Sequence, residues 1–336
     1  MSENKKAALI GCGMIADTHL TALQNAGADV IGVYDRNPGA AAAFAGARGL
    51  KVYDSLEDLL ADETALVSVC TPSGTHGELA EAIMEKGKYA IVEKPMALTV
   101  PECRRIMETE QRTGRFCAPI SQLRFSRVYR EVKAALDEGQ FGRMIVGLLS
   151  MKYYRAPSYY AGSWRGTVKM DGGGALMNQG IHGIDMMCGL LGYPVSVSGK
   201  TATLLHDIEV EDTAVASLVF PDGTLGVIDG STAITHAKAR RLELCGAKAS
   251  VTIEEDAIRS AEGITLSCEE GSGYNSYSDP TAISTLLHEN QFRNILAAAA
   301  DEEALYYTSR DAMRTVAVIT AVYESSKTGT AAVPLL

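Results

Sequence analysis

The sequence contains no long hydrophobic run and no recognisable export signal. The apolar run near its start covers only residues 7–10, which is too short for the core of a signal peptide. A membrane-spanning helix needs about 20 mostly apolar residues, and no such stretch is present. We therefore expect a cytoplasmic protein with no membrane partner.

Basic clusters are missing as well. The chain has 31 Lys and Arg against 41 Asp and Glu, a formal net charge of -10, and no basic run is longer than a pair such as Arg104-Arg105. Proteins that bind nucleic acid present a basic patch, so we expect no nucleic-acid partner. A small-molecule ligand fits this composition better.

Paired cysteines are the third absence. The seven cysteines are odd in number, and none stands two to four residues from another, the spacing typical of a zinc site. We expect reduced thiols and no metal site.

Residues 1–122 alternate short apolar runs with helical patterns, which is typical of βαβ units around a parallel sheet. The candidate strands are residues 7–10, 30–34, 66–70, 89–92 and 116–119, and the candidate helices are residues 15–25, 55–60, 75–85 and 101–112. This pattern predicts an α/β Rossmann domain with a doubly wound parallel sheet.

Residues 123–336 contain long β-rich runs on either side of one glycine-rich helical segment. Turn residues such as Pro221-Asp222-Gly223 separate these runs and predict consecutive hairpins. We expect an α+β domain with a large, mainly antiparallel open sheet, whose exposed face joins subunits into a homodimer or homotetramer. Helical patterns at residues 282–299 and 310–326 close the domain, and we expect the last helix to pack back on the first domain.

The run from Gly11 to Ala16 lies between the first predicted strand and the first predicted helix and matches G-x-G-x-x-A. The first glycine permits a tight turn, the second permits close approach to a pyrophosphate, and the helix N-terminus favours phosphate. A carboxylate ends the next strand about 20 residues further on, where it can bind a ribose. The predicted cofactor contacts are Gly11, Gly13, Met14, Ile15 and Asp35.

Asp35 also favours NAD, because its carboxylate would repel the 2′-phosphate of NADP. Arg36 leaves an alternative open, since a guanidinium can pair with that phosphate or stack on adenine. NADP is therefore the less favoured cofactor.

Thr71, Pro72 and His76 follow another predicted strand, at the edge where open α/β sheets bind ligands. They either border the cofactor or form a plain loop with a helix cap, and the sequence leaves both interpretations open.

The stretch from Asp171 to Gly192, DGGGALMNQGIHGIDMMCGLLG, begins with three glycines that suit a turn or a close backbone approach. Helical spacing then predicts an apolar stripe and, beside it, a stripe of Asn178, His182 and Asp185. His182 is the candidate base for proton transfer. The alternative is a histidine that only satisfies a hydrogen bond in the core.

With Glu93-Lys94-Pro95, these motifs resemble the Gfo/Idh/MocA family of sugar and polyol dehydrogenases over essentially the whole chain. The resemblance includes the segment Gln122-Leu123-Arg124-Phe125 at the entry to the second domain. It implies that Lys94 contacts both the nicotinamide ribose and the reacting hydroxyl, with His182 as acid or base and Glu93 and Gln122 near the cofactor. Oxidation of a secondary alcohol needs such a proton acceptor at oxygen and a hydride acceptor at carbon.

The implied function is an NAD-dependent dehydrogenase that oxidises a secondary ring hydroxyl of a sugar, a sugar derivative or a cyclitol. Asn178 departs from inositol-type members, which carry aspartate at that position. Asn followed by Gln is closer to members that act on nucleotide-linked or N-acetylated sugar acids. Asp185 either supplies the missing carboxylate or bridges another element.

Residues 152–166 contain the only tryptophan, four tyrosines and two arginines directly before the glycine-rich helix. Aromatic faces can cover sugar rings, and guanidinium groups can bind carboxylates, phosphates or hydroxyls. We expect substrate contacts from Arg124, Tyr154, Arg155, Tyr160, Trp164, Arg165, Asn178 and Asp185. A subunit interface is the alternative for the aromatic residues. His288 and Gln291, near the start of a C-terminal helix, could reach the cleft, but a cap or surface role is favoured for each.

Two other functions remain open. Some relatives cleave glycosidic bonds by transient oxidation with a tightly held NAD. Others are non-catalytic regulators that respond to nucleotides, a role with little need of Lys94 and His182.

Overall fold

The computed structural model describes residues 5–267 and 285–336, and its contacts divide the chain into two compact units. Within the described residues, the first unit comprises 5–122 and 285–313, and the second comprises 123–267 and 314–336. The division after Gln122 lies where the sequence pattern changes, but 285–313 belong to the first unit rather than to the second.

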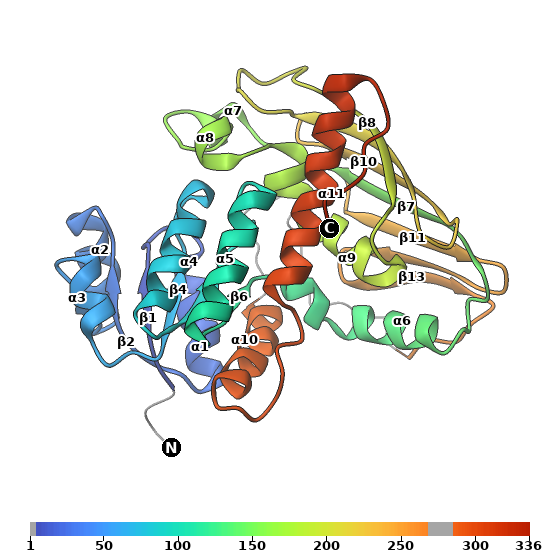
Figure 1. Cartoon of the computed structure of the whole chain (residues 1–336). Coiled ribbons are helices and arrows are strands. Elements are labelled where there is room, and N and C mark those ends of the chain that lie inside the picture. The colour runs from blue at the N-terminus through green and yellow to red at the C-terminus, as the bar shows by residue number, and fades with distance from the viewer. Residues whose placement is uncertain (1–4, 268–284) are drawn as a thin grey trace. The chain divides into compact units, whose positions relative to one another are not determined.

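The first unit is built on a six-stranded parallel sheet with strand order β3-β2-β1-β4-β5-β6 (Figure 1). Its strands are β1 (Lys6–Ile10), β2 (Asp29–Tyr34), β3 (Lys51–Val52), β4 (Leu66–Val69), β5 (Tyr89–Val92) and β6 (Cys117–Pro119). The intervening helices are α1 (Ala16–Ala26), α2 (Pro38–Gly46), α3 (Leu56–Ala61), α4 (His76–Glu85) and α5 (Val100–Thr113). The predicted Rossmann sheet is confirmed.

Local signals set the helix boundaries of this unit. Thr99 and Glu102 form a capping box at the start of α5, and Gly114 in the left-handed region ends that helix. The sequence reading missed α2, whose nearly uniform run of small apolar residues has no helical period. Its start is nevertheless marked by Asn37, whose side chain accepts the N–H groups of the first turn.

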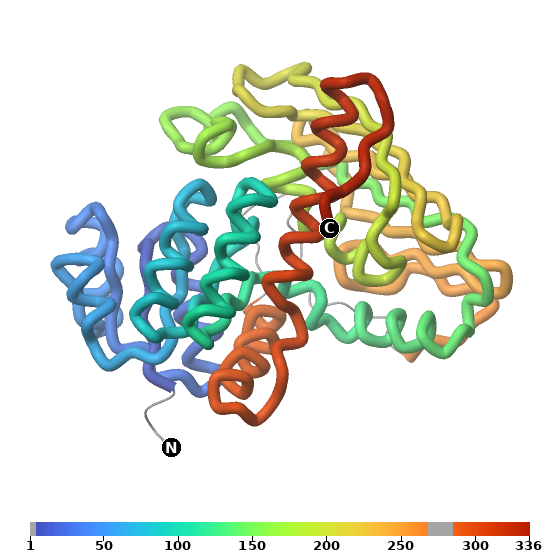
Figure 2. The backbone as a smooth tube through the Cα atoms, viewed as in Figure 1, coloured from blue at the N-terminus to red at the C-terminus, as the bar shows by residue number. Residues whose placement is uncertain are grey.

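Helix α10 (Thr285–Ala299) packs on α1, although the two are far apart in the sequence (Figure 2). Phe292, Ile295 and Leu296 are buried in the same core as Leu20 and Leu23 of α1. The apolar face of α10 packs on the apolar face of α1, and this packing explains why residues 285–299 belong to the first unit.

The second unit contains a seven-stranded sheet with order β13-β12-β11-β7-β10-β9-β8. The strands are β7 (Met144–Lys152), β8 (Ser196–Ala202), β9 (Thr213–Val219), β10 (Leu225–Ser231), β11 (Arg241–Gly246), β12 (Ser250–Glu254) and β13 (Ala257–Glu262). Every neighbouring pair is antiparallel except β7 and β10. The predicted mainly antiparallel open sheet is confirmed, and β13 is an additional strand.

Helices pack against this sheet (Figure 1). The second unit contains α6 (Arg127–Asp137), α7 (Pro157–Tyr160), α8 (Val168–Asp171), α9 (Ile181–Leu191) and most of α11 (Ser309–Thr328). Gly147 of β7 gives α9 room, because a Cβ there would lie 2.5 Å from Leu191. Side chains alternate along β9, where Ala214, Ala216 and Leu218 are buried and the residues between them are exposed. None of the helices in the described ranges has the length and apolar composition that a bilayer crossing requires.

Candidate functional site

The turn between β1 and α1 has the geometry that a phosphate-binding loop needs. Gly11 has φ +92°, and a Cβ on it would lie 2.8 Å from the backbone of Cys70, so only glycine fits. Nothing lies within 4 Å of a Cβ built on Gly13, which leaves the backbone there open to approach. No side chain caps the first turn of α1. Its N–H groups can therefore serve an anionic ligand.

Asp35 follows β2 and joins its end to this loop. One carboxylate oxygen accepts the N–H of Cys12 and the other accepts the N–H of Asn37, each at 2.8 Å. The carboxylate thus lies beside the glycine turn, as its predicted role at a ribose requires. Arg36 and Met14 are exposed, and Ile15 is half-buried at the start of α1.

His76 connects the loops that follow β4 and β5. Its Nδ1 lies 2.7 Å from the carbonyl oxygen of Pro95, and its Nε2 lies 2.9 Å from that of Thr71. Carbonyl oxygens only accept, so both contacts are hydrogen bonds only when the ring carries both protons. Burial lowers the pKa of His76, while the two carbonyls oppose that effect. The sequence left open whether His76 borders the cofactor, and the structure shows its ring buried between two backbone loops.

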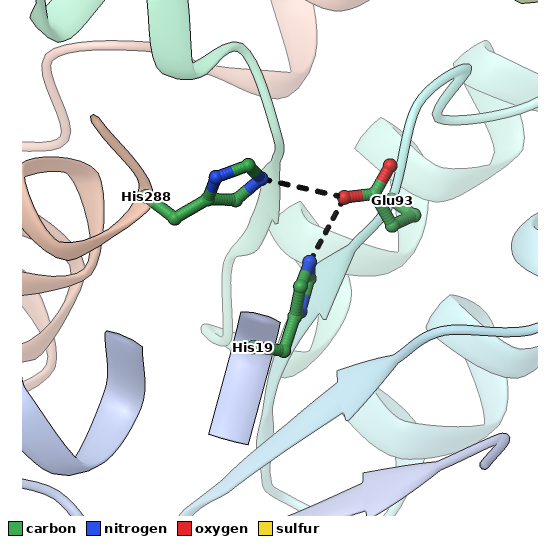
Figure 3. A group of neighbouring side chains, drawn as sticks. All are labelled: His19, Glu93 and His288. Carbon is green, nitrogen blue, oxygen red and sulfur yellow. Dashed lines mark hydrogen bonds and ion pairs between the residues drawn. The ribbon is translucent and has the colours of Figure 1, made fainter. Parts of the chain in front are cut away.

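Glu93 directly follows β5 and lies in a buried cluster with two histidines (Figure 3). Its Oε1 lies 2.9 Å from Nε2 of His19 and 3.9 Å from Nε2 of His288. Its Oε2 accepts the backbone N–H of Lys94 at 3.0 Å. One carboxylate therefore ties α1, β5 and α10 together and fixes the backbone at Lys94.

The charge states in this cluster follow from its bonds. Burial raises the pKa of Glu93, but the two histidines outweigh it and hold that pKa well below its usual range. An ionised carboxylate only accepts, so Nε2 of His19 is the donor. Burial lowers the pKa of His19, which leaves a neutral ring whose Nδ1 accepts the hydroxyl of Ser68 at 2.8 Å.

Two histidines and a glutamate are also the residue types of zinc sites, so the distances matter. Tetrahedral ligands with zinc bonds of about 2.0–2.1 Å lie roughly 3.3 Å apart. The 2.9 Å between His19 and Glu93 is instead the length of a hydrogen bond. We therefore interpret the cluster as a hydrogen-bonded anchor.

Gln122 has a buried side-chain acceptor with no hydrogen-bond partner among the described residues. It is 3% exposed, and its Oε1 is one of three buried side-chain atoms in the described ranges that have no hydrogen-bond partner. A buried, unsatisfied acceptor costs about 1–3 kcal/mol unless a ligand or water supplies a donor. Contact between Gln122 and the cofactor stays a prediction.

In the second unit, the three glycines make a turn that no other residue fits. Gly172 has φ +73°, and a Cβ on Gly173 or Gly174 would lie 2.1 Å from Tyr323 or from the carbonyl oxygen of Glu211. The Glu211 carboxylate accepts the N–H groups of Gly174 and of Leu176, at 3.0 and 2.8 Å, and the hydroxyl of Tyr323 at 2.9 Å. Both functions expected of the glycines, a turn and a close approach, are present.

The segment after these glycines is not one continuous α-helix, and that expectation is wrong. Residues Ala175–Gly180 form a π-helical turn, with an i→i+5 bond from the N–H of Gln179 to Gly174, and α9 begins at Ile181. The wider turn changes the phase, so spacing at 100° per residue does not relate Asn178 to His182. His182 lies half-buried in the first turn of α9.

Arg124 and Asp185, both expected at the substrate, bind each other. Nε and Nη2 of Arg124 donate to the two carboxylate oxygens at 2.8 and 2.9 Å, and both residues are buried. Tyr129 accepts from Arg124, and Thr315 of α11 donates to Asp185. The structure thus shows Asp185 in the second of its two expected roles, as a bridge between elements.

Asn178 also has a carboxylate partner. Its side-chain N–H donates to Asp171, and its oxygen accepts from Gln179 at 2.9 Å. The oxygen of Gln179 in turn accepts Nε and Nη2 of Arg155, at 3.1 and 2.7 Å. Four side chains therefore form one hydrogen-bonded chain from a buried carboxylate to a guanidinium.

The remaining candidate substrate residues gather in the aromatic segment around α7. The Tyr160 hydroxyl donates to Thr232 at 3.1 Å. The Arg165 guanidinium lies 4.7 Å from the ring centroid of Tyr159 and 5.0 Å from that of Trp164. Tyr154 forms a β-bridge with Ala233. Within the second unit, this segment adjoins the Asn178 chain through Arg155.

Several residues that organise the site were not predicted from the sequence. His19, Asp171 and Glu211 were not singled out, since each acts through a partner from another element or from an irregular turn. His288 and Gln291 were assigned a cap or surface role, which is wrong, because both are only 1% exposed. Gln291 bonds the backbone at Ser121 and Pro119.

Known proteins resemble the chain over most of its length. A model of an oxidoreductase family with an NAD-binding Rossmann fold matches residues 5–120, and a model of the GFO/IDH/MocA C-terminal domain matches residues 129–252. Inositol 2-dehydrogenase of Rhizobium meliloti is 30% identical over 276 residues, 79% of each chain. The scyllo-inositol 2-dehydrogenase (NAD(+)) of Bacillus subtilis is 27% identical over 301 residues, 86% of this chain and 83% of that protein.

Solved structures share the fold as well. The WlbA dehydrogenase from Bordetella pertussis, in complex with NADH and UDP-GlcNAcA, superimposes with a TM-score of 0.87. The two chains are 28% identical, and the similarity covers 98% of this chain and 97% of that one.

Gly174→Ala tests the glycine turn. The added Cβ would meet the backbone of Glu211 at 2.1 Å, so we expect the free energy of unfolding to fall by about 2–3 kcal/mol in denaturant titrations. Gly46→Ala is the control, since nothing lies within 4 Å of its Cβ, and its effect should stay within about 1 kcal/mol. Equal stability of the two variants would contradict the close approach.

Because burial lowers the pKa of His19, we expect the folded protein to lose stability at acid pH. The folded-state pKa of His19 is lowered, so the unfolded chain takes up a proton below about pH 6.5 that the folded chain does not. Stability should therefore fall on acidification, by up to about 1.4 kcal/mol per pH unit for each such histidine. His19→Gln retains a donor for Glu93 without a titrating ring. Its unfolding free energy should decline less steeply between about pH 7 and pH 5, and an unchanged slope would contradict the prediction.

Proposed function

Since the chain belongs to the Gfo/Idh/MocA family of NAD-binding oxidoreductases, we propose that it oxidises a secondary ring hydroxyl of a sugar, a sugar derivative or a cyclitol. The observation that supports this proposal most is the arrangement at the carboxyl edge of the six-stranded sheet. The glycine loop, Asp35, the Thr71 loop and Lys94 each follow one of four neighbouring parallel strands. Open α/β sheets bind their ligands at this edge.

The residues at this edge fit NAD. The uncapped start of α1 suits the pyrophosphate, the Asp35 carboxylate suits an unphosphorylated ribose, and the unsatisfied oxygen of Gln122 offers a further acceptor. When bound, NAD supplies the carbon that accepts the hydride. Thr71, Pro72 and Glu93 shape the loops around it.

The proton of the hydroxyl needs its own acceptor. We assign Lys94 to polarise the hydroxyl and His182 to take up the proton as general base in the oxidation. This assignment requires the Lys94 ammonium and the His182 imidazole to reach the same oxygen atom of the substrate. Glu93 contributes by holding the backbone N–H of Lys94.

The aromatic segment supports a ring-shaped, hydroxyl-rich substrate. Tyr154, Tyr160 and Trp164 provide flat faces for the C–H groups of a sugar, and the guanidinium groups of Arg155 and Arg165 provide donors. The dehydrogenase relatives are named for inositols, and the WlbA structure contains a nucleotide-linked sugar acid. Both substrate classes belong in a screen.

Lys94→Met tests the assignment, because it removes the ammonium and keeps most of the side-chain volume. We expect kcat/KM for NADH formation to fall by about 100-fold or more, while NAD binding weakens far less, because Lys94 is only one of its expected contacts. NADH absorbance and fluorescence titration measure the two quantities. Unchanged turnover would exclude Lys94 from the reaction, and release of an aglycone without net NADH would favour a glycoside hydrolase.

We also propose that the exposed face of the seven-stranded sheet joins two copies of the chain. Val215 and Val219 of β9 and Leu225 and Val227 of β10 are exposed on these adjacent strands, with Val219 opposite Leu225. An exposed apolar patch of this kind is typical of a subunit interface.

The pair Val219→Glu/Leu225→Glu would place two carboxylates opposite each other on this face and should convert an oligomer to a monomer in light scattering. Leu286→Glu, at an exposed position on α10 in the first unit, is the control. A native protein that is already monomeric would rule out the interface.

A further inference from the structure

Donors and acceptors follow a fixed order along the hydrogen-bonded chain of side chains from Asp171 to Arg155. An ionised carboxylate only accepts, so the nitrogen of Asn178 must face Asp171. The oxygen of Asn178 then faces Gln179, whose nitrogen donates to it and whose oxygen is left to accept from Arg155. Neither amide can be turned over without placing like groups together. Asp171 thus determines how both amides and the guanidinium are oriented.

Asp171 is held in place independently of this chain. It is the last residue of α8 and only 1% exposed, and its second carboxylate oxygen accepts the N–H of Gly166 at 2.8 Å. Two phenols face its charge, those of Tyr160 and Tyr323. Burial mainly raises the pKa of each phenol, and Asp171 adds to the rise. Glu211 is the further carboxylate beside Tyr323.

At its other end, the hydrogen-bonded chain of side chains reaches the aromatic segment. Gln179 also donates to the Tyr159 hydroxyl at 2.9 Å. The Arg155 guanidinium lies 5.5 Å from the ring centroid of Tyr153 and 5.8 Å from that of Tyr159, and it donates to the carbonyl oxygen of Tyr154 at 3.0 Å. Asn178 itself lies in the π-helical turn that leads into α9 and His182. One buried carboxylate therefore connects the start of the proposed catalytic helix to the proposed sugar-binding segment.

We propose that Asp171 is the positioning residue of the substrate site, and that the polarity of its pair with Asn178, a carboxylate at 171 and an amide at 178, orients the arm formed by Gln179 and Arg155. This inference rests on the proposed function. The arm holds a polar ring substituent of the substrate, such as a hydroxyl or a carboxylate, in one orientation against the tyrosines. The amide at 178 is therefore matched to the carboxylate at 171, and neither residue can be exchanged alone.

Exchanging the two residues tests this match directly. Asn178→Asp alone places two carboxylates within hydrogen-bonding distance in a buried position, where they cannot both ionise. The double variant Asp171→Asn/Asn178→Asp restores one carboxylate and one amide. In it, the new amide oxygen can accept from Gly166, its nitrogen can donate to position 178, and the new carboxylate can accept from Gln179.

We expect Asn178→Asp to lower kcat/KM by about tenfold or more, mainly through KM, because repulsion from Asp171 displaces the side chain at 178 and, with it, the Gln179–Arg155 arm. Its activity relative to the native protein should rise as the pH falls, since one shared proton relieves the repulsion. The double variant should recover most of the loss and abolish this relative pH dependence. Asn25→Asp, at an exposed position in α1, is the control and should behave as the native protein.

Unfolding measurements keep this test separate from that of the proposed function. A double-mutant cycle of Asn178→Asp, Asp171→Asn and the double variant, followed by thermal unfolding, should show a loss of stability in Asn178→Asp and its recovery in the double variant, whether or not a substrate has been found. A double variant no more stable than Asn178→Asp would overturn the pairing. Recovered stability with native KM and pH dependence in every variant would overturn the positioning role. If no sugar yields NADH with the native protein, the proposed function fails, and the unfolding cycle still decides the pairing.

Discussion

The nucleotide-binding unit depends on the negative charge of Glu93, which is buried where β5 ends. A buried carboxylate is stable only when its charge is matched by donors, and here His19 and the backbone N–H of Lys94 are those donors, with His288 close by. Because His19 belongs to α1 and His288 to α10, the same charge draws both helices toward the end of β5. The placement of Lys94 is thus a consequence of how this unit folds.

The second unit also contains several buried carboxyl groups that are matched by hydrogen-bond donors. Glu211 accepts N–H groups at the glycine turn, Asp171 accepts the N–H of Gly166 and the amide of Asn178, and Asp185 binds Arg124. In each case a buried carboxyl group accepts from backbone or side-chain donors, and for Glu211 and Asp171 these donors lie where the chain is irregular. The glycines follow from this arrangement, since Gly173 and Gly174 leave room for Tyr323 and Glu211. Irregular backbone around the proposed site is held by hydrogen bonds to buried carboxyl groups rather than by helical or sheet periodicity.

The contrast between periodic elements and irregular segments explains which parts of the structure could be predicted from the sequence. The Rossmann sheet, the antiparallel sheet and the Gly11 and Asp35 motif obey local periods and fixed spacings, so they were predictable. His19 and Glu93 meet across 74 residues, and no local pattern indicates such a pair. Asp171 and Asn178 are only seven residues apart, but the π-helical turn between them follows neither of the two ordinary periods. The sequence therefore revealed the groups proposed to act on ligands better than the groups that hold them.

The amide at Asn178 is best understood together with Asp171. Considered alone, asparagine at this position lacks a charge that could act on a neighbouring imidazole. In the fold, its nitrogen is committed to a buried carboxylate, and its oxygen is turned toward Gln179 and, through it, toward Arg155. A second carboxylate in place of that amide would face Asp171 within hydrogen-bonding distance. The local electrostatics of the second unit thus select an amide at 178, and the same selection orients the guanidinium beside the tyrosines where a sugar is proposed to bind.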